Sequence, residues 1–342
     1  MKNCLNILDR QLISHSESAT LGLSSGKTGV CIYFYCQSRL IGNREYESAA
    51  GKLLDEIFEK IDTVGYYDVK SGLAGIGLGV DYLIDNKFVA GDINTVLKAV
   101  DDKIFRQTAY YSDNEMINPE TLIHLLYYFC VRLQKLNSGS EQQYLVKELT
   151  ISIINELSKQ PIREIFEEPL FFTTDYLLPQ YLFVLSKIAG IGFYNYKIIK
   201  ILQELSVFLL SQIPLLHSNR LYLLWAMDAV NRQIETKNWN KHIAMLRREL
   251  DVNEIINGEC RSRNIYFNDG LTAIFLLLSA LSDYFTANEL SGYKQAIINK
   301  IQTSPEWERL AEDSEYFATR CGLYDGYCGT SLLLNCYERE LK

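Results

Sequence analysis

Two kinds of apolar pattern alternate along this chain of 342 residues. Seven segments, which start near residues 26, 72, 119, 175, 219, 270 and 326, are apolar on nearly every side, as is typical of buried helices. The charged segments between them carry apolar residues on one face only; Leu53, Ile57 and Ile61, for example, recur at intervals of four. Because no segment keeps an alternation of period two, the pattern predicts an all-α protein.

A glycine signature marks four of these seven segments. Gly26, Gly72, Gly270 and Gly326 each open a G-x-x-[G/A] motif followed by an apolar run of helical length. The segments recur about every 45–56 residues, the size of one helix pair in a repeat array. With residues 4–13 as the seventh half-exposed helix, the repeat predicts an α/α toroid (α/α barrel) of seven inner and seven outer helices in a single domain, residues 1–342. An open solenoid is the alternative, but it requires polar capping helices, whereas the last apolar run, residues 330–338, is almost terminal and needs the first repeat to cover it.

The glycine positions also suggest where a ligand would bind. In a toroid all inner helices point the same way, so their N-termini, with partial positive charge and free N–H groups, converge at one mouth. A concave mouth of helix N-termini is a natural ligand site. The residues expected there are Gly26, Gly72, Gly270, Gly326, Tyr67, Tyr324, Tyr327 and His217.

With these motifs in place, the sequence resembles the lanthionine synthetase C-like (LanC-like) family. The matching stretches are residues 22–39, 71–92 and 322–334, and the second is similar to forms common in Bacteroidetes members. The resemblance implies a role in ribosomal peptide modification, in which a cyclase adds a peptide cysteine to a dehydrated serine or threonine. It implies zinc held by Cys, Cys and His, which lowers the pKa of the substrate thiol. It also implies a precursor peptide and a dehydratase as partners.

The sequence departs from the family at the positions where zinc ligands are expected. Residues 218–220 read Ser-Asn-Arg, residues 268–270 read Asn-Asp-Gly, and residues 324–326 read Tyr-Asp-Gly, without a cysteine or a histidine. Cys260, Cys321 and Cys328 do not have a usual zinc spacing and are expected to be buried or loop thiols. We therefore expect no metal site and no cofactor, and a protein that is zinc-independent or non-catalytic.

Two further readings stay open. Asp269 and Asp325 occupy equivalent positions in adjacent repeats, so they are candidates for a catalytic acid and base acting on a glycoside, although aspartates there also suit helix capping. A non-catalytic peptide-binding scaffold is the other reading. Lys27 lies in a G-x-x-x-G-K-T stretch, which is one residue shorter than a P-loop and does not follow a strand, so we interpret it as a helix start.

Composition then narrows the function classes. The net charge of −8 argues against nucleic-acid binding, which favours a basic surface. The eight cysteines include no C-x-x-C pair and indicate reduced thiols in a cytoplasmic protein. Asp9 and Arg10 stand where a signal peptide would be apolar. The longest apolar run, residues 273–278, is far shorter than the roughly 18–20 residues of a membrane span.

Overall fold

A computed structural model describes residues 6–17, 19–110, 118–236 and 238–340. This part of the chain contains helices and no strand, which confirms the all-α prediction. It divides into two compact units: unit 1 comprises the described residues of 1–108, 265–267 and 301–342, and unit 2 those of 109–264 and 268–300. A single domain over residues 1–342 stays a prediction.

Unit 1 contains the first two repeats and the last one. Its helices are α1 (Ile7–Ser16), α2 (Lys27–Ile41), α3 (Arg44–Lys60), η1 (Ile61–Thr63), α4 (Leu73–Asp85), α5 (Ile93–Val96), most of α6 (Lys98–Tyr110), α17 (Pro305–Glu312), α18 (Ser314–Thr319) and α19 (Tyr327–Glu340). α2 and α4 are buried along most of their length, while α3 buries only Tyr46, Ala50, Leu53 and Ile57. The predicted alternation of buried and half-exposed helices is therefore present in this unit.

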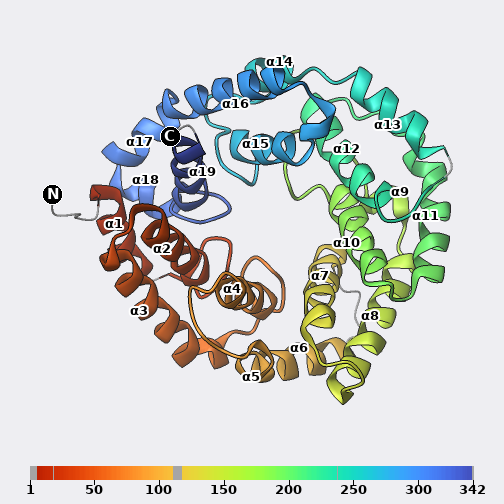
Figure 1. The fold of residues 1–342 in the computed structure, drawn as a ribbon, viewed down its shortest axis with the longest axis horizontal. Coiled ribbons are helices and arrows are strands. Elements are labelled where there is room, and N and C mark those ends of the chain that lie inside the picture. The colour runs from red at the N-terminus through yellow and green to blue at the C-terminus, as the bar shows by residue number, and fades with distance from the viewer. Residues whose placement is uncertain (1–5, 18, 111–117, 237, 341–342) are drawn as a thin grey trace. The chain divides into compact units, whose positions relative to one another are not determined.

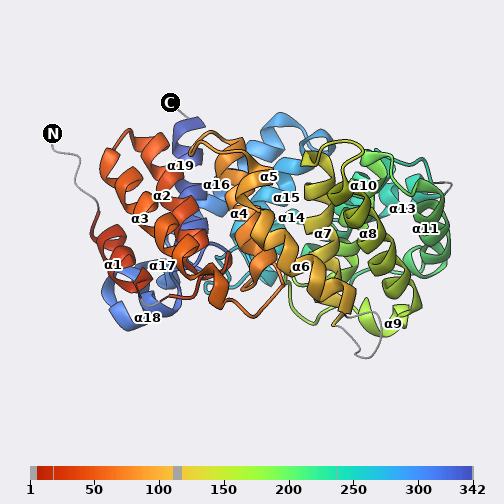
Figure 2. The same cartoon turned by 90° about the horizontal axis from the view of Figure 1, so that it is seen from below.

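The last repeat of the chain packs on the first. Figures 1 and 2 show α19 beside α2, with α3 on the other side of α2. The loops before these helices are also joined, because the backbone N–H groups of Leu323 and Tyr324 both donate to the carbonyl oxygen of Ser24, at 2.8 and 3.1 Å. The apolar face of α19 is thus covered by the first repeat, as the sequence predicted.

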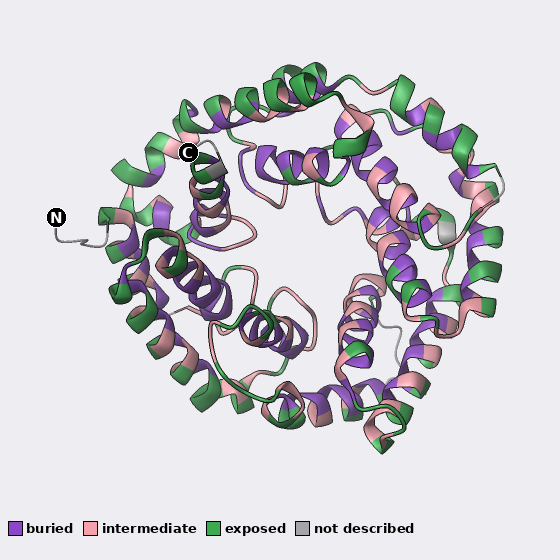
Figure 3. Cartoon of the chain, viewed as in Figure 1, coloured by how far each residue is buried: buried purple, intermediate pink, exposed green. Residues whose placement is uncertain are grey.

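Unit 2 contains the middle repeats. Its helices are α7 (Pro119–Lys135), α8 (Glu141–Lys159), α9 (Ile162–Ile165), α10 (Leu177–Ile191), α11 (Asn195–Leu209), α12 (His217–Asn231), α13 (Trp239–Arg248), α14 (Val252–Glu254), the π-helix η2 (Ile255–Glu259), α15 (Leu271–Ala280), η3 (Ser282–Tyr284) and most of α16 (Ala287–Gln302). α7, α10 and α12 pack side by side, and α8, α11 and α13 pack on them. Figure 3 shows that burial is concentrated on α7, α10, α12 and α15 in this unit, which fits their apolar sequences.

Lys27 has a structural role in this fold. It is 1% exposed, and its ammonium group donates to the Glu56 carboxylate and, at 3.1 Å, to the carbonyl oxygen of Glu17. The hydrogen bond from Lys27 lowers the pKa of Glu56. A buried ammonium needs such partners because burial disfavours its charge. Gly26 is the N-cap of α2, so the G-K-T stretch is a helix start, as predicted.

Candidate functional site at the N-termini of the core helices

We call α2, α4, α7, α10, α12, α15 and α19 the core helices. Four of them share one way of starting. The backbone N–H of the first helical residue donates to the carbonyl oxygen of the residue seven positions earlier. These bonds are Lys27 to Thr20 (2.8 Å), Leu73 to Tyr66 (2.9 Å), Leu271 to Asn264 (3.0 Å) and Tyr327 to Arg320 (2.7 Å). The loop before each helix therefore supplies one acceptor that the first turn of a helix otherwise lacks.

The glycines of the motif make room for these loops. A Cβ atom on Gly72 would lie 2.6 Å from the Tyr66 carbonyl oxygen, and one on Gly326 would lie 2.3 Å from that of Arg320. A Cβ atom on Gly26 would likewise lie 2.5 Å from the carbonyl oxygen of Gly22. Each loop thus occupies the space beside its glycine, and one of its carbonyl oxygens accepts a backbone N–H group from the first helical residue. The chain's own backbone therefore lies close to these glycines, and ligand binding at these positions stays a prediction.

The predicted mouth tyrosines differ in exposure. Tyr67 and Tyr324 are partly exposed, and the Tyr324 ring lies near Phe267 (5.5 Å between ring centroids) and Lys70 (5.8 Å from the ammonium to the ring). Tyr327 is only 2% exposed. The structure therefore corrects the prediction for Tyr327, which is a core residue because the first repeat covers α19.

Tyr327 belongs to a buried polar cluster around Asp9 that sequence reasoning missed. The Asp9 carboxylate, 1% exposed, accepts hydrogen bonds from Tyr33 (2.7 Å), Tyr327 (3.2 Å) and Tyr46. Burial raises the pKa of Asp9, and the tyrosine hydrogen bonds oppose this rise. Burial also raises the pKa of Tyr327 to about 12. The cluster joins α1, α2, α3 and α19, so it stabilises the contact between the first and last repeats.

The two aspartates proposed as an acid and base pair lie in different units. In unit 1, Asp325 accepts the Ser25 hydroxyl at 2.8 and 2.9 Å through its two carboxylate oxygens. In unit 2, Asp269 is half-buried in the loop before α15. Each is described within its own unit, so a joint catalytic role for Asp269 and Asp325 stays a prediction.

In unit 2, two glutamates hold the start of α12. The Glu259 carboxylate accepts the backbone N–H groups of His217 (2.6 Å) and Ser218 (2.8 Å) and the Ser218 hydroxyl (2.6 Å). The Glu168 carboxylate accepts the N–H groups of Leu215 (3.0 Å) and Leu216 (3.3 Å). Negative charge at a helix N-terminus is favourable, so these two carboxylates stabilise the start of α12.

His217 was predicted to contact a ligand. Its Nδ1 atom accepts the backbone N–H of Asp251 at 3.1 Å and lies 3.3 Å from the Arg220 guanidinium. Arg220 also donates to the Pro214 carbonyl oxygen at 2.8 Å and to that of Glu249. One ring nitrogen of His217 is thus used to hold the loop that contains Asp251.

Replacing Glu259 tests this arrangement. Glu259→Ala removes three hydrogen bonds from a partly exposed carboxylate, and we expect a loss of about 1–2 kcal/mol in the free energy of unfolding. Glu259→Gln should cost less because its amide oxygen still accepts one N–H. Urea unfolding followed by circular dichroism measures both. Equal stability of the alanine variant and the wild type would show that water replaces Glu259 at no cost.

The residues around the start of α12 do not fit a zinc ion. Ser218 and Asn219 are fully buried polar residues, and the nearby carboxylate of Glu259 is already bound to N–H groups. The Cys260 thiol is buried, and burial raises its pKa to about 12. In the described ranges, no three His, Cys, Asp or Glu residues are grouped so that they could hold a metal ion.

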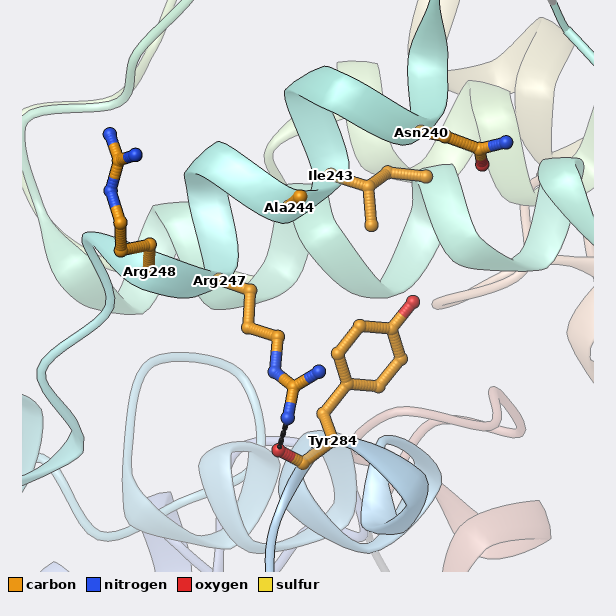
Figure 4. Close-up of a pocket in the computed structure, with 6 residues that line it drawn as sticks. All are labelled: Asn240, Ile243, Ala244, Arg247, Arg248 and Tyr284. Atoms are coloured by element: carbon orange, nitrogen blue, oxygen red, sulfur yellow. Dashed lines mark hydrogen bonds between the residues drawn. The ribbon is translucent and has the colours of Figure 1, made fainter.

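A separate shallow pocket of about 430 Å³ lies against α13 in unit 2. Figure 4 shows Arg247 donating to the carbonyl oxygen of Tyr284, at 2.7 Å, with Arg248 turned away from that ring. The other residues that line it are Asn240, Ile243 and Ala244. None of the predicted site residues lines this pocket, so it does not support any of the predicted chemistry.

Comparison with known proteins shows a similarity in fold. No family model matches the chain, and no curated protein matches its sequence. Among solved structures, nisin cyclase is similar with a TM-score of 0.69 and 14% sequence identity, covering 97% of this chain and 93% of that chain. In the described residues, no helix has the length and apolar character that crossing a membrane requires. The similarity confirms the predicted fold class: this chain has the all-α toroid fold of nisin cyclase.

Proposed function

We propose that this chain is a LanC-like protein that binds a peptide during ribosomal peptide modification and acts without zinc. The observation that carries the proposal is the similarity to nisin cyclase over nearly the whole chain. The glycine-led motifs at residues 26–29, 72–75 and 326–329, which carry the resemblance to the LanC-like family, support it from the sequence.

The donor set supports the part of the proposal that concerns zinc. A zinc-dependent cyclase needs thiolate and imidazole ligands and an open coordination position for the substrate thiol. At the start of α12, this chain has Ser218 and Asn219, and at the start of α15 it has Asn268 and Asp269. Their hydroxyl, amide and carboxylate groups are not the thiolate and imidazole ligands that zinc prefers in such sites, and Ser218 and Asn219 are hydrogen-bonded within the chain. A precursor peptide is the proposed partner, with a dehydratase as a second partner and the cytoplasm as the location.

The test combines metal analysis with a peptide assay. The probe is a synthetic peptide that contains one dehydroalanine and one cysteine. We expect well below one zinc per chain, saturable binding of the peptide, and no loss of free thiol beyond that of peptide alone. Ring closure leaves the mass unchanged, so alkylation of the remaining thiol followed by mass spectrometry measures it.

Two results would contradict the proposal. One zinc per chain, together with thiol loss that a chelator abolishes, would make the protein a conventional zinc cyclase. Failure to bind the probe, or equal binding of a control peptide of unrelated composition, would remove peptide modification as the function. Heat-treated protein serves as the control for non-specific thiol loss.

A further inference from the structure

Two loops at the N-terminal ends of α10 and α12 expose large apolar side chains. In the described residues, six large apolar or tyrosine side chains are at least 75% exposed: Ile7 (75%), Leu170 (85%), Phe171 (77%), Tyr196 (81%), Val207 (82%) and Leu215 (86%). Three of the six lie in these two loops of unit 2, and Ile213, 54% exposed, adds a fourth apolar residue there. We call Leu170, Phe171, Ile213 and Leu215 the apolar loop pair.

The two loops are joined by hydrogen bonds. Glu168 in the first loop accepts the backbone N–H groups of Leu215 (3.0 Å) and Leu216 (3.3 Å) in the second. The Asn219 amide group then donates to Glu168 at 3.0 Å and to the Pro169 carbonyl oxygen at 3.1 Å. Leu170 follows Pro169 directly, so the exposed residues of both loops are held in the same region of unit 2.

Both exposed segments have anchored neighbours. Phe172, the residue after Phe171, is 6% exposed, and its ring packs edge-on against Tyr222 with 6.3 Å between the ring centroids. Pro214, before Leu215, is buried, and its carbonyl oxygen accepts a hydrogen bond from Arg220. The chain on either side of the apolar residues is therefore fixed against α12. Apolar side chains that are held in water in this way mark an interaction surface.

The loop that carries Leu170 and Phe171 is acidic. Residues 163–176, tied by hydrogen bonds to α12, contain four carboxylates and one arginine. Residues 247–263, which also contact the start of α12, are balanced, with four carboxylates and four arginines. In the acidic loop, Glu164 and Glu167 are exposed. A partner that buries apolar side chains here is favoured when it carries positive charge.

We propose that the apolar loop pair docks a peptide segment in which apolar or aromatic residues alternate with lysine or arginine. The proposal rests on the proposed peptide-binding function and adds the surface and the chemistry of the bound segment. A second copy of this chain is disfavoured, because a symmetric contact would place the same acidic loops against each other in a protein of net charge −8. In the proposed peptide, the apolar residues would cover the exposed apolar side chains, and the lysine or arginine residues would pair with the nearby carboxylates.

A binding measurement with a simple probe tests this inference. The probe is a fluorescein-labelled peptide of about twelve residues made only of Lys, Leu and Phe, and the comparison peptide has every Lys replaced by Glu. We expect the double variant Leu170→Ser with Phe171→Ser to bind the basic peptide at least about 10-fold more weakly than the wild type, since two apolar contacts are lost. Val207→Ser is the matched control, because Val207 is equally exposed on α11 of the same unit, and its affinity should stay within about two-fold.

Several outcomes would overturn the inference. These are unchanged affinity of the double variant, binding of the glutamate peptide as tight as that of the lysine peptide, and no binding of the basic peptide by the wild type. A wild-type dimer that the double variant converts to a monomer, seen by sedimentation, would assign the surface to a second copy instead. Circular dichroism melts confirm that each variant is folded.

This experiment also separates the inference from the proposed function. The probe has no cysteine, serine, threonine or dehydroalanine, so its binding does not depend on any modification chemistry. Binding that is lost in the double variant supports the docking surface even if the assay with dehydroalanine and cysteine fails. Conversely, if the basic peptide binds equally well to the wild type and to the double variant while the dehydroalanine peptide binds the wild type saturably, the proposed function stands and the docking surface is wrong.

Discussion

Asp9→Ala is expected to lower the free energy of unfolding by about 3–5 kcal/mol, because the buried carboxylate accepts three tyrosine hydrogen bonds. The variant leaves the hydroxyl groups of Tyr33 and Tyr46 without this acceptor and opens a cavity between α1, α2 and α19. Trp307, which stacks on Tyr327 with 5.7 Å between the ring centroids, gives a fluorescence signal close to the cluster. Urea unfolding followed by this fluorescence and by circular dichroism measures the loss.

Asp9→Asn is the control, since its amide keeps an acceptor of nearly the same shape and carries no charge to bury. We expect a much smaller loss than for alanine. A loss equal to that of Asp9→Ala would mean that the negative charge, rather than the hydrogen bonds, holds the cluster together.

The pH dependence of the difference between wild type and Asp9→Asn follows from the raised pKa of Asp9. Because the folded state favours the protonated form, this contribution to stability is fully present below the ordinary pKa of 3.8 and is lost as the pH rises through the higher pKa of the folded protein. The wild type should therefore lose stability relative to Asp9→Asn over this window. A difference that stays constant from pH 3.5 to pH 8 would contradict a raised pKa.

Gly75→Ala is expected to lower the free energy of unfolding by at least about 3 kcal/mol, because even the methyl group of alanine would clash with the neighbouring backbone at this position. A Cβ atom there would lie 1.9 Å from the carbonyl oxygen of Val69, which is backbone. The loop before α4 would have to move, and this would disturb the bonds from Leu73 to Tyr66 and from Ser24 to Lys70, at 2.9 Å each. Thermal unfolding and hydrogen exchange of α4 measure the effect.

The same substitution at Gly292 is the matched control. Gly292 lies in α16, and a Cβ atom there would meet nothing within 4 Å. Alanine favours a helix over glycine by up to about 1 kcal/mol, so Gly292→Ala should raise the stability slightly. If Gly75→Ala were equally harmless, the close approach of the Val69 carbonyl would not explain why a glycine stands at that position.

The starts of the core helices could be predicted from the sequence. α2, α4, α15 and α19 each begin one residue after the glycine that marks them, because a G-x-x-[G/A] motif and an apolar run are local signals. α12 begins at His217, two residues before the predicted position. The short helices α17 and α18 were not anticipated, since neither is long enough to show a clear apolar period.

The candidate site was only partly predictable. The positions 218–220 lie in the first turn of α12, and the positions 268–270 lie in the loop directly before α15. The carboxylates that accept the N–H groups at the start of α12 come from other parts of the chain. Glu259 lies in the π-helix, and Glu168 lies in the loop after α9. Neither glutamate belongs to a motif, and a carboxylate in a sequence looks the same whether it caps a distant helix or faces water.

By itself, the sequence determined the all-α class, the order of buried and half-exposed helices, and the glycines that begin four of them, because helix periodicity and backbone sterics act between residues close in the chain. Only the tertiary structure decided which polar groups meet. Asp9 and Tyr327 are 318 residues apart in sequence and form one buried cluster, and Glu168 joins the loops that expose Leu170 and Leu215. Such contacts depend on how the helices pack, and a polar residue gains its partner, its burial and its shifted pKa only at that level.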